Sequence, residues 1–392
     1  MSILHVEYPH LMFKKQWILS EKSLIYLGQC EAYVRSINNT PILPHHYAQL
    51  MNVALMKGAQ ATTAIEGNTL SDEEVKKIME KQKLPPSKAY QEIEVKNILE
   101  AFNELLNEIL DAKTDHFISV DLLLRFHKMV GKDLGEHFNA IPGQLRNNDV
   151  VVGSYRCPDY RDVPTLLERM CQWLREEFRY KEKEQSFSEV VIQAIISHIY
   201  IEWIHPFGDG NGRTGRLAEF YILLRGGNPD IASHILSNYY NLTRTAYYRQ
   251  IEKATQEKDL SNFIEYALLG FRDGLVHTLE IIQKSQFENT WKSLIFGKFD
   301  EIRSTVTEEV FKRQRTLALE MPMNKPISLS DITNVSIPLA KIYSTISGKT
   351  LQRDMEKLLE LMLVVKLEDK YIANIDVLHS MIAKRKVVNH SN

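Results

Sequence analysis

Apolar residues recur at helical spacing along most of this chain, and glycine and proline gather at a few joints between the helical stretches. Residues 47–66 keep a helical pattern that stops at Gly67 and Asn68, a pair suited to a left-handed helix end. In residues 190–203 apolar side chains occupy almost every side of the helical wheel, which is typical of a helix buried all round. The pattern predicts a mainly α protein with a buried central helix.

A fixed corner is predicted directly after Glu66. Ser71 and Glu74 form a capping box, which marks the start of a new helix. Leu70 and Val75 are placed as the hydrophobic staple of the same helix. Glu66 therefore stands at a rigid turn between two helices.

Strand signals are confined to two places. The turn-rich residues 147–149 are followed by Val150, Val151 and Val152, which predicts a short β-hairpin that we treat as a flap. A long charged helical stretch ends near residue 320, and residues 321–326 then break it like an interdomain linker. Beyond the linker, residues 351–372 have the order helix, strand, turn, strand, so a small C-terminal winged-helix (α+β) domain is expected.

The composition of the chain bears on its binding partners and on its location in the cell. The 48 basic and 50 acidic side chains nearly cancel, so no whole-chain field draws the protein to nucleic acid or an anionic membrane. Cys30, Cys157 and Cys171 lack metal-ligand spacing and fit a reducing compartment, so a cytoplasmic location is expected. No signal peptide is predicted at the N-terminus, and no apolar run approaches bilayer length, so no membrane partner is expected.

The chemistry is concentrated in residues 205–216, which read HPFGDGNGRTGR. Glycines in such a loop let successive backbone N–H groups point into one concavity that binds an anion, and the following helix adds its positive N-terminal end. Arg213 and Arg216 are three residues apart and share a helix face, so both guanidinium groups can reach a polyphosphate. Three glycines build this loop: Gly208, Gly210 and Gly212.

Two further residues complete the predicted site. Asp209 supplies a hard oxygen ligand suited to Mg²⁺ carried by the phosphates. His205 ends the buried helix at the edge of the loop and can be neutral near pH 7, as a general base must be. Together with the loop, these residues indicate transfer of a phosphoryl-type group from a nucleotide to a nucleophile that His205 deprotonates.

This segment resembles the signature of the Fic family and matches it at every defined position. The resemblance implies a protein adenylyltransferase, which moves AMP from Mg-ATP to a Ser, Thr or Tyr hydroxyl of itself or of a target protein. It also implies that His205 deprotonates this hydroxyl and that Asp209 holds Mg²⁺. The resemblance covers roughly residues 115–270 and includes Gly143, Arg146, the flap and residues 241–248.

The same resemblance assigns the phosphate contacts. Asn211 and the backbone of Gly210 and Gly212 would cradle the α-phosphate. Arg213 and Arg216 would take the β- and γ-phosphates. In the related Doc-type kinases a lysine typically replaces the glycine at position 212, so Gly212 favours adenylyl transfer over phosphorylation. The flap would pair with the backbone of the target as an added strand.

Four parts of the chain are predicted on this basis. They are an N-terminal helical region with an inhibitory motif (1–114), a Fic catalytic core (115–270), connecting helices (271–320) and a winged-helix-like domain (321–392).

The inhibitory motif spans Thr62 to Glu66 and resembles the brake of Fic proteins, a Ser or Thr followed four residues later by Glu. In that interpretation Glu66 pairs with Arg216 and occupies the guanidinium that the γ-phosphate needs. An ordinary glutamate at a helix end is the alternative. In some family members the same glutamate activates a water for the reverse reaction, de-AMPylation, and the sequence leaves this open.

Two other parts of the chain leave alternative interpretations open. Tyr247 and Tyr248 either stack on adenine, as the family pattern suggests, or pack in the core. The predicted winged helix could bind DNA through Lys349 and Arg353, but its acidic residues would repel phosphates, so protein binding or homodimer formation stays open. The acidic residues of this helix are Asp354, Glu356 and Glu360.

Two alternatives to adenylyl transfer remain at this stage. One is another phosphoryl or nucleotidyl transfer on the same fold. The other is a DNA-binding regulator that uses nucleotide only as a signal. A purely binding role is disfavoured, because it requires no base at His205.

Overall fold

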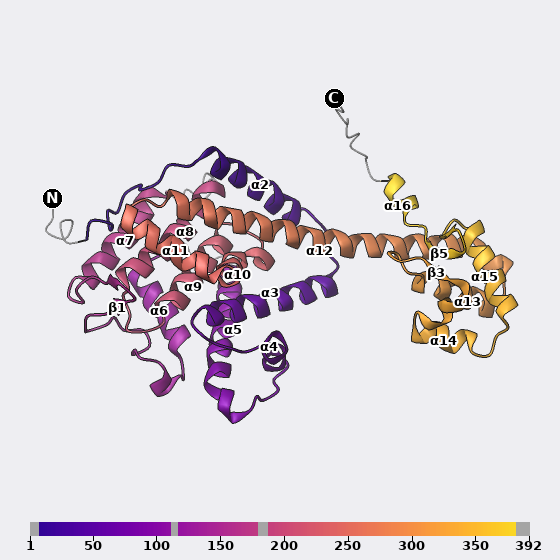
Figure 1. The fold of residues 1–392 in the computed structure, drawn as a ribbon, viewed down its shortest axis with the longest axis horizontal. Helices are drawn as coiled ribbons and strands as arrows, with labels where there is room; N and C mark the ends of the chain where they lie inside the picture. Colours follow the sequence, from indigo (N-terminus) through magenta and orange to yellow (C-terminus); the bar gives the residue numbers. More distant parts are fainter. Residues whose placement is uncertain (1–7, 111–116, 179–186, 382–392) are drawn as a thin grey trace. The chain divides into compact units, whose positions relative to one another are not determined.

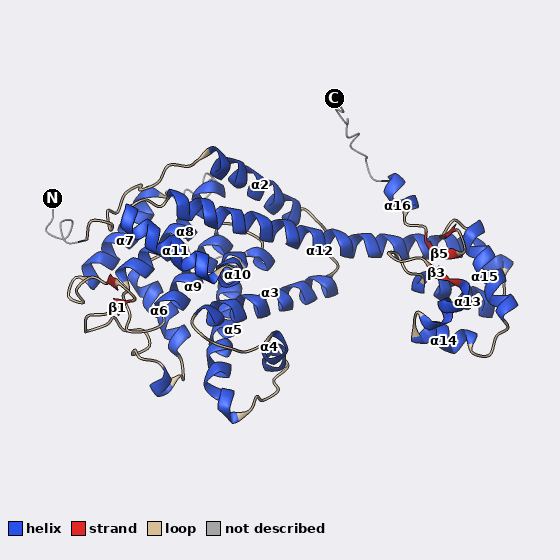
Figure 2. Cartoon of the chain, viewed as in Figure 1, coloured by secondary structure: helices blue, strands red, loops and turns tan. Residues whose placement is uncertain are grey.

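Helices form nearly all of the regular structure, as the apolar pattern predicts (Figures 1 and 2). The computed structural model describes residues 8–110, 117–178 and 187–381. The chain divides into two compact units, one up to Ile282 and one from Gln283. The helices of the first unit are α2 (Glu21–Asn38), α3 (Pro44–Ile65), α4 (Asp72–Met79), α5 (Ala89–Leu110), α6 (Val120–Gly131), α7 (Val163–Glu177), α8 (Phe187–Ile204), α9 (Asn211–Arg225), α10 (Ile235–Leu242), α11 (Arg244–Glu257) and the first part of α12 (Ser261–Ile302), with short 3-10 turns at Pro86–Lys88, Gly135–His137 and Asp230–Ala232.

The central helix is α8, which is buried from Val190 to Ile204 except at Glu202. Contrary to the expectation from the sequence, α8 is long and apolar enough to cross a membrane by length and composition. Its apolar side chains lie inside the protein, where α8 packs against α9, and this burial explains the composition. The loop between these two helices is the predicted catalytic segment, so a rigid pair of helices holds both of its ends.

The corner after α3 has the predicted geometry. Gly67 takes a positive φ of 102°, which ends the helix, and Ser71 and Glu74 make both hydrogen bonds of a capping box at the start of α4. Helix α3 packs against α5, α9 and α10. These contacts bring Glu66 next to the first turn of α9.

The flap is a two-stranded antiparallel hairpin of β1 (Val151–Val152) and β2 (Tyr155–Arg156). Val150 directly precedes it, and its carbonyl accepts a hydrogen bond from the Cys157 N–H at 3.2 Å. The Val151 and Val152 side chains are 62% and 46% exposed. The hairpin is therefore confirmed as a structure with apolar side chains open to solvent.

The second unit has its own core, to which the last part of α12 contributes. It contains the predicted order of helix, strand, turn and strand, and its three strands pair antiparallel in the order β3-β5-β4. Its elements are α13 (Glu308–Glu320), β3 (Ile327–Ser328), α14 (Ile337–Tyr343), α15 (Gly348–Glu360), β4 (Val364–Leu367), β5 (Lys370–Ala373) and α16 (Asp376–Met381), with 3-10 turns at Arg303–Thr305 and Leu329–Asn334.

One expectation for this unit was wrong, namely that Asp354 is a solvent-facing acidic residue that repels phosphates. Asp354 is 1% exposed and accepts hydrogen bonds from Arg313, Gln314 and Tyr343, so it does not face solvent and cannot repel an approaching phosphate as we expected. Lys349 and Arg353 are exposed on the same helix. The sequence did not reveal this because Arg313 lies 41 residues away.

The boundary between the two compact units lies inside a helix. Helix α12 runs without a break through residue 270, and the two units separate after Ile282, inside this helix. Helix α13 precedes the linker predicted at 321–326 but packs in the same core as the elements that follow it. An uninterrupted helical pattern contains no local signal for such a boundary.

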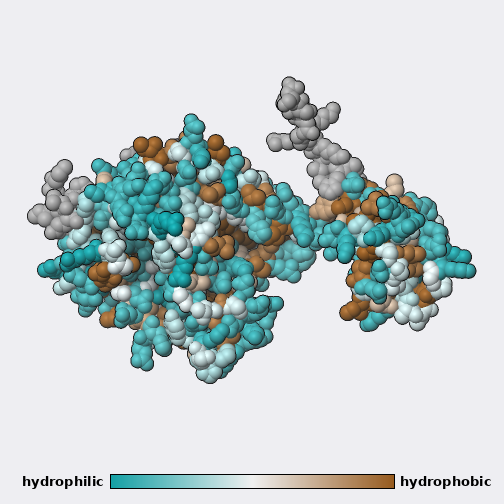
Figure 3. Space-filling model, in the orientation of Figure 1, coloured by the Kyte–Doolittle hydropathy of each residue, from teal (hydrophilic) through white to brown (hydrophobic). Residues whose placement is uncertain are grey.

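The face of the molecule shown in Figure 3 is mostly hydrophilic, with smaller apolar areas. A groove of about 500 Å³ lies between α3, α10 and α12, where Val53, Leu242 and Ile281 contribute to its lining. None of its lining residues belongs to the loop at 205–216. The groove is thus separate from the candidate site.

Four buried histidines are expected to make the protein unstable in acid. Burial lowers the pKa of His10, His127, His205 and His234 to about 4, from 6.5. Below pH 6.5 the unfolded chain takes up protons that the folded protein does not, so stability is lost as the pH falls toward 4. At pH 5 each histidine should cost about 2 kcal/mol of the free energy of unfolding.

Urea unfolding at pH 7 and pH 5 measures this loss. His234→Gln removes one of the four groups and should reduce the pH dependence by about a quarter. An unfolding free energy that stays equal at the two pH values would contradict the prediction.

Candidate active site

His205 lies at the rim of the loop, one residue beyond the end of α8. Its φ is +49°, an uncommon value for a non-glycine residue, and its N–H donates to the Ile201 carbonyl at 2.9 Å. Burial lowers the pKa of His205 to about 4. The imidazole is therefore neutral near pH 7 and able to accept a proton.

Arg146 ties this histidine to the flap. Its Nε donates to the His205 carbonyl at 2.7 Å, and its two Nη atoms donate to the carbonyls of Asn148 and Pro158 on either side of the hairpin. Its backbone N–H also donates to the Pro206 carbonyl at 3.0 Å. One buried guanidinium thus joins the base of the flap to the backbone that carries the imidazole.

The loop is closed by side chains within it and beneath it. The Asn211 amide accepts from the Phe207 N–H and donates to the Phe207 carbonyl, both at 2.9 Å. The His127 ring stacks on the Phe207 ring with centroids 3.8 Å apart. Because the His127 Nδ1 accepts from the Gly143 N–H, its Nε2 carries the proton and donates to the Asp209 carbonyl at 3.0 Å. In this structure Asn211 therefore uses its side chain to hold the loop.

Two glycines of the loop lie where a side chain would be strained or crowded. Gly210 has a φ of +77° and precedes the first turn of α9. At Gly212 a Cβ would collide with the Glu66 Oε1 and would lie 2.9 Å from the Arg216 Nη1. The Glu66 carboxylate thus lies directly against the start of α9, where the sequence places the phosphates.

Glu66 and Arg216 form an ion pair in which the arginine is buried and the glutamate is partly exposed. The Glu66 Oε1 lies 2.5 Å from the Arg216 Nη2, which also donates to the Thr62 carbonyl at 2.9 Å. The Arg216 side chain is 1% exposed. Burial alone would raise the pKa of Glu66, but the Arg216 guanidinium outweighs burial and lowers it. The structure thus brings together Thr62, Glu66 and Arg216, the residues that the interpretation of the inhibitory motif involves.

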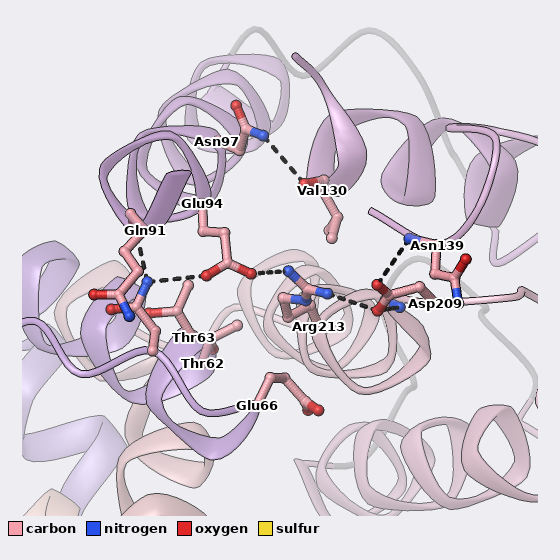
Figure 4. A network of polar contacts seen from close by, with 12 residues as sticks. Thr62, Thr63, Glu66, Gln91, Glu94, Asn97, Val130, Asn139, Asp209 and Arg213 are labelled. Carbon is pink, nitrogen blue, oxygen red and sulfur yellow. Dashed lines mark hydrogen bonds and ion pairs between the residues drawn. The ribbon is translucent and has the colours of Figure 1, made fainter. Parts of the chain in front are cut away.

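Arg213 has two carboxylate partners (Figure 4). Its Nη1 pairs with Glu94 of α5, and its Nη2 pairs with the Asp209 Oδ1 at 2.8 Å. The guanidinium carbon also lies 5.4 Å from the centre of the Phe138 ring. Arg213 is therefore held in one place before any phosphate binds.

Asp209 fits a metal that arrives with a nucleotide. Its Oδ2 accepts from the Asn139 N–H at 3.2 Å, and its side chain is 30% exposed. The described residues contain no cluster of three His, Cys, Asp or Glu side chains that could hold a metal alone. Mg²⁺ bound to phosphates needs only one or two protein carboxylates, because phosphate oxygens and waters supply its other ligands.

The two predicted aromatic residues lie in different surroundings. Tyr247 is 1% exposed, and its hydroxyl lies 2.8 Å from the His198 Nε2, so it packs in the core. Tyr248 is 46% exposed and donates to the Ile65 carbonyl at 3.2 Å, one residue before Glu66. Of the two, only Tyr248 presents an open ring beside the site.

Three supporting residues had no role in the site assigned from the sequence: Glu94, Asn68 beside it and His127. Glu94 and His127 lie in helices whose polar positions resemble any solvated face, and their partners are distant in the chain. Glu94 and Arg213 are 119 residues apart. Asn68 was assigned only to the helix stop, which it also makes here.

Comparison with known proteins identifies the class of this fold and site. Residues 117–223 match the Fic/DOC family. Over these residues the chain is thus similar to the Fic domain. Its fold resembles a Fic family protein from Desulfovibrio desulfuricans G20, with a TM-score of 0.56 and 18% identity over 92% of this chain and 98% of that one. It also resembles residues 134–508 of Fic-1 from Caenorhabditis elegans, with a TM-score of 0.54 and 24% identity over 67% and 74% of the two chains.

Sequence relatives carry an enzymatic name. The chain is 33% identical over 207 residues to protein adenylyltransferase fic-1 of Caenorhabditis briggsae, covering 52% of this chain and 37% of that protein. It is 32% identical over 206 residues to protein adenylyltransferase Fic of Culex quinquefasciatus, covering 52% and 38%. The chain thus spans less than two fifths of the length of these relatives.

Proposed function

We propose that this protein is an adenylyltransferase that moves AMP from ATP to a Ser, Thr or Tyr hydroxyl of itself or of a target protein. One observation carries the proposal. A neutral imidazole, His205, stands at the rim of a glycine-built anion loop into which two buried arginines project. The names of the sequence relatives support the same reaction.

The proposed reaction exchanges one P–O bond for another, and His205 accepts the proton that is released. The hydroxyl oxygen attacks the α-phosphorus of ATP, a new P–O bond forms, and the bond from the α-phosphorus to the bridging oxygen breaks. Pyrophosphate leaves, and the hydroxyl proton passes to His205. Arg213 and Arg216 neutralise the charge that develops on the leaving group.

Mg²⁺ is part of the proposal as a companion of ATP. Asp209 is the residue that would hold it, because this carboxylate lies in the loop and is partly exposed. When bound, the metal would neutralise phosphate charge and orient the leaving group.

Glu66 acts as a brake in this proposal. Its carboxylate occupies Arg216 and lies against Gly212, so it takes the space and the cation that the triphosphate needs. A carboxylate in this position also repels the phosphates. Productive binding of ATP therefore requires Glu66 to move away from Arg216.

The flap is the proposed docking edge for the target backbone, since Val151 and Val152 are exposed on a short hairpin beside His205. The C-terminal unit is proposed to be a winged helix, on the order of its helices and strands. Its exposed Lys349 and Arg353 suit either DNA or a protein surface, including a second copy of this chain. A cytoplasmic location is proposed with it, since all three cysteines are free and buried.

Arg146→Lys is expected to weaken the link between the flap and His205. Lysine can replace one of the three side-chain hydrogen bonds but cannot span all three carbonyls. In a Glu66→Gly background we expect AMP incorporation to fall roughly tenfold, because the target strand and the base lose their mutual alignment. Labelled-AMP incorporation measures the rate, and limited proteolysis reports whether the flap has loosened. Equal rates for the two proteins would contradict this role of Arg146.

ATP labelled on either the α- or the γ-phosphate tests the proposed function. Label should enter protein from α-labelled ATP only, and mass spectrometry should find the mass of AMP on a hydroxyl side chain. Transfer of the γ-label, or the mass of a phosphate, would instead favour a kinase reaction. No incorporation by either wild type or Glu66→Gly, with and without a cell lysate, would contradict the proposal.

A further inference from the structure

A second carboxylate meets the anion loop from helix α5, at a different residue from the one that Glu66 contacts. Glu94 is 4% exposed, and its Oε1 accepts a hydrogen bond from the Arg213 Nη1 (Figure 4). Placing a carboxylate in the interior costs several kcal/mol unless charge and hydrogen bonds compensate it. Arg213 supplies that charge, so the two side chains depend on each other for their burial.

Arg213 links Glu94 to Asp209, because its guanidinium donates hydrogen bonds to both carboxylates. The Arg213 Nη2 donates to the Asp209 Oδ1 at 2.8 Å, while the Asn139 N–H donates to the Oδ2 at 3.2 Å. The Gly210 N–H also donates to the Oδ1 at 2.5 Å. Three donors therefore set the orientation of the Asp209 carboxylate, and the only side-chain donor among these three, Arg213, is itself fixed by Glu94. A guanidinium that binds one carboxylate through each Nη group can transmit a fixed orientation, because it is planar and rigid.

Asn68 holds Glu94 from its other side. The Asn68 Nδ2 donates to the Glu94 Oε2 and to the Gln91 carbonyl, both at 3.0 Å. Its Oδ1 accepts from the Leu70 N–H at 3.0 Å, so the amide cannot be flipped without losing these bonds. Asn68 lies two residues after Glu66, and the corner that carries the brake thus also fixes Glu94.

We propose that Glu94 is a positioning residue: it fixes Arg213 and, through Arg213, presents the Asp209 carboxylate to the divalent cation that accompanies the nucleotide. This inference rests on the proposed function. It assigns Glu94 a role separate from that of Glu66, which blocks the nucleotide. Outer-sphere partners of this kind typically change metal affinity or activity by about 10- to 100-fold when they are replaced.

Glu94→Gln in the Glu66→Gly background tests the proposal. Glutamine keeps the shape of the side chain but loses its charge. Its single oxygen can accept a hydrogen bond from Arg213 or from Asn68, but not from both, and its NH₂ group would then face the other donor. Titration of Mn²⁺ by electron paramagnetic resonance, with a non-hydrolysable ATP analogue present, should show an affinity about tenfold weaker than that of the parent. The kcat for AMP incorporation should fall by a similar factor, while the KM for the target protein stays unchanged.

Glu100→Gln is the matched control on the same helix. Glu100 forms an exposed pair with Lys132 at 2.8 Å, so this variant should bind Mn²⁺ as the parent does. Asn68→Ala is the second variant, in case Glu94→Gln does not fold. It keeps the Arg213 pair but removes the hydrogen bond from Asn68 to Glu94, and it should weaken Mn²⁺ binding about threefold.

The outcomes separate this inference from the proposed function. Equal Mn²⁺ affinity in the Glu94→Gln and Glu100→Gln proteins overturns the role of Glu94, as does a parent that binds no Mn²⁺ with the nucleotide. If Glu94→Gln does not fold, unchanged affinity in Asn68→Ala overturns it. A parent that binds Mn²⁺ but transfers no AMP contradicts the adenylyltransferase, while a weaker affinity in Glu94→Gln still supports the positioning role.

Discussion

Replacing His205 with alanine in the Glu66→Gly background is expected to lower AMP incorporation about a thousandfold. The target hydroxyl is a poor nucleophile until its proton is removed, and a positioned general base typically contributes about 10²- to 10⁴-fold to such a step. Burial already holds the pKa of this imidazole near 4, so no proton has to leave it at pH 7. The rate should be measured under single-turnover conditions, where product release does not mask the transfer step.

Two controls make this result specific to the base. His45 is exposed and lies far from the loop in the sequence, so His45→Ala should leave the rate unchanged. ATP affinity should also be nearly the same in the parent and in His205→Ala, because the arginines and the loop backbone remain. A His205→Ala protein that transfers AMP within tenfold of the parent rate would show that another group removes the proton.

Features with short-range signals were predictable from the sequence. The capping box of Ser71 and Glu74 and the left-handed stop at Gly67 depend on residues within a few positions of one another. The flap and the loop between α8 and α9 are local in the same sense. The Fic signature then assigned roles inside that loop, and the structure brings Glu66 to Arg216 as the inhibitory motif predicts.

Pairings between distant helices were not predictable. Glu94 lies in a helix with an ordinary amphipathic pattern, and only the packing of α5 near α9 brings it to Arg213. Asp354 looked like a solvent-facing acid for the same reason, since its partner Arg313 belongs to another helix. A single sequence records which residues are polar, but the tertiary fold decides whether a polar residue meets solvent, a partner or a ligand.

Glu66→Gly is expected to raise AMP incorporation about a hundredfold or more, because the ion pair that Glu66 makes with the buried Arg216 must otherwise be broken before the γ-phosphate can bind. The exposed Glu73 of the neighbouring helix provides the control, and Glu73→Gln should behave as wild type. Glu66→Gln retains the shape without the charge, so its rate should lie between those of wild type and Glu66→Gly. Incorporation of labelled AMP by the purified proteins measures all of these rates.

Glu66→Gly is expected to be more active but less stable than wild type, and the loss of stability tests the cause of the activation. Without Glu66, Arg216 remains buried at 1% exposure with the Thr62 carbonyl as its remaining acceptor, and the ATP-free protein should lose about 3 kcal/mol of unfolding free energy. Mg-ATP restores a negative partner to Arg216, so it should raise the melting temperature of Glu66→Gly more than that of wild type. Faster AMP transfer without this larger thermal shift would mean that Glu66 restrains the enzyme by some route other than its hold on Arg216.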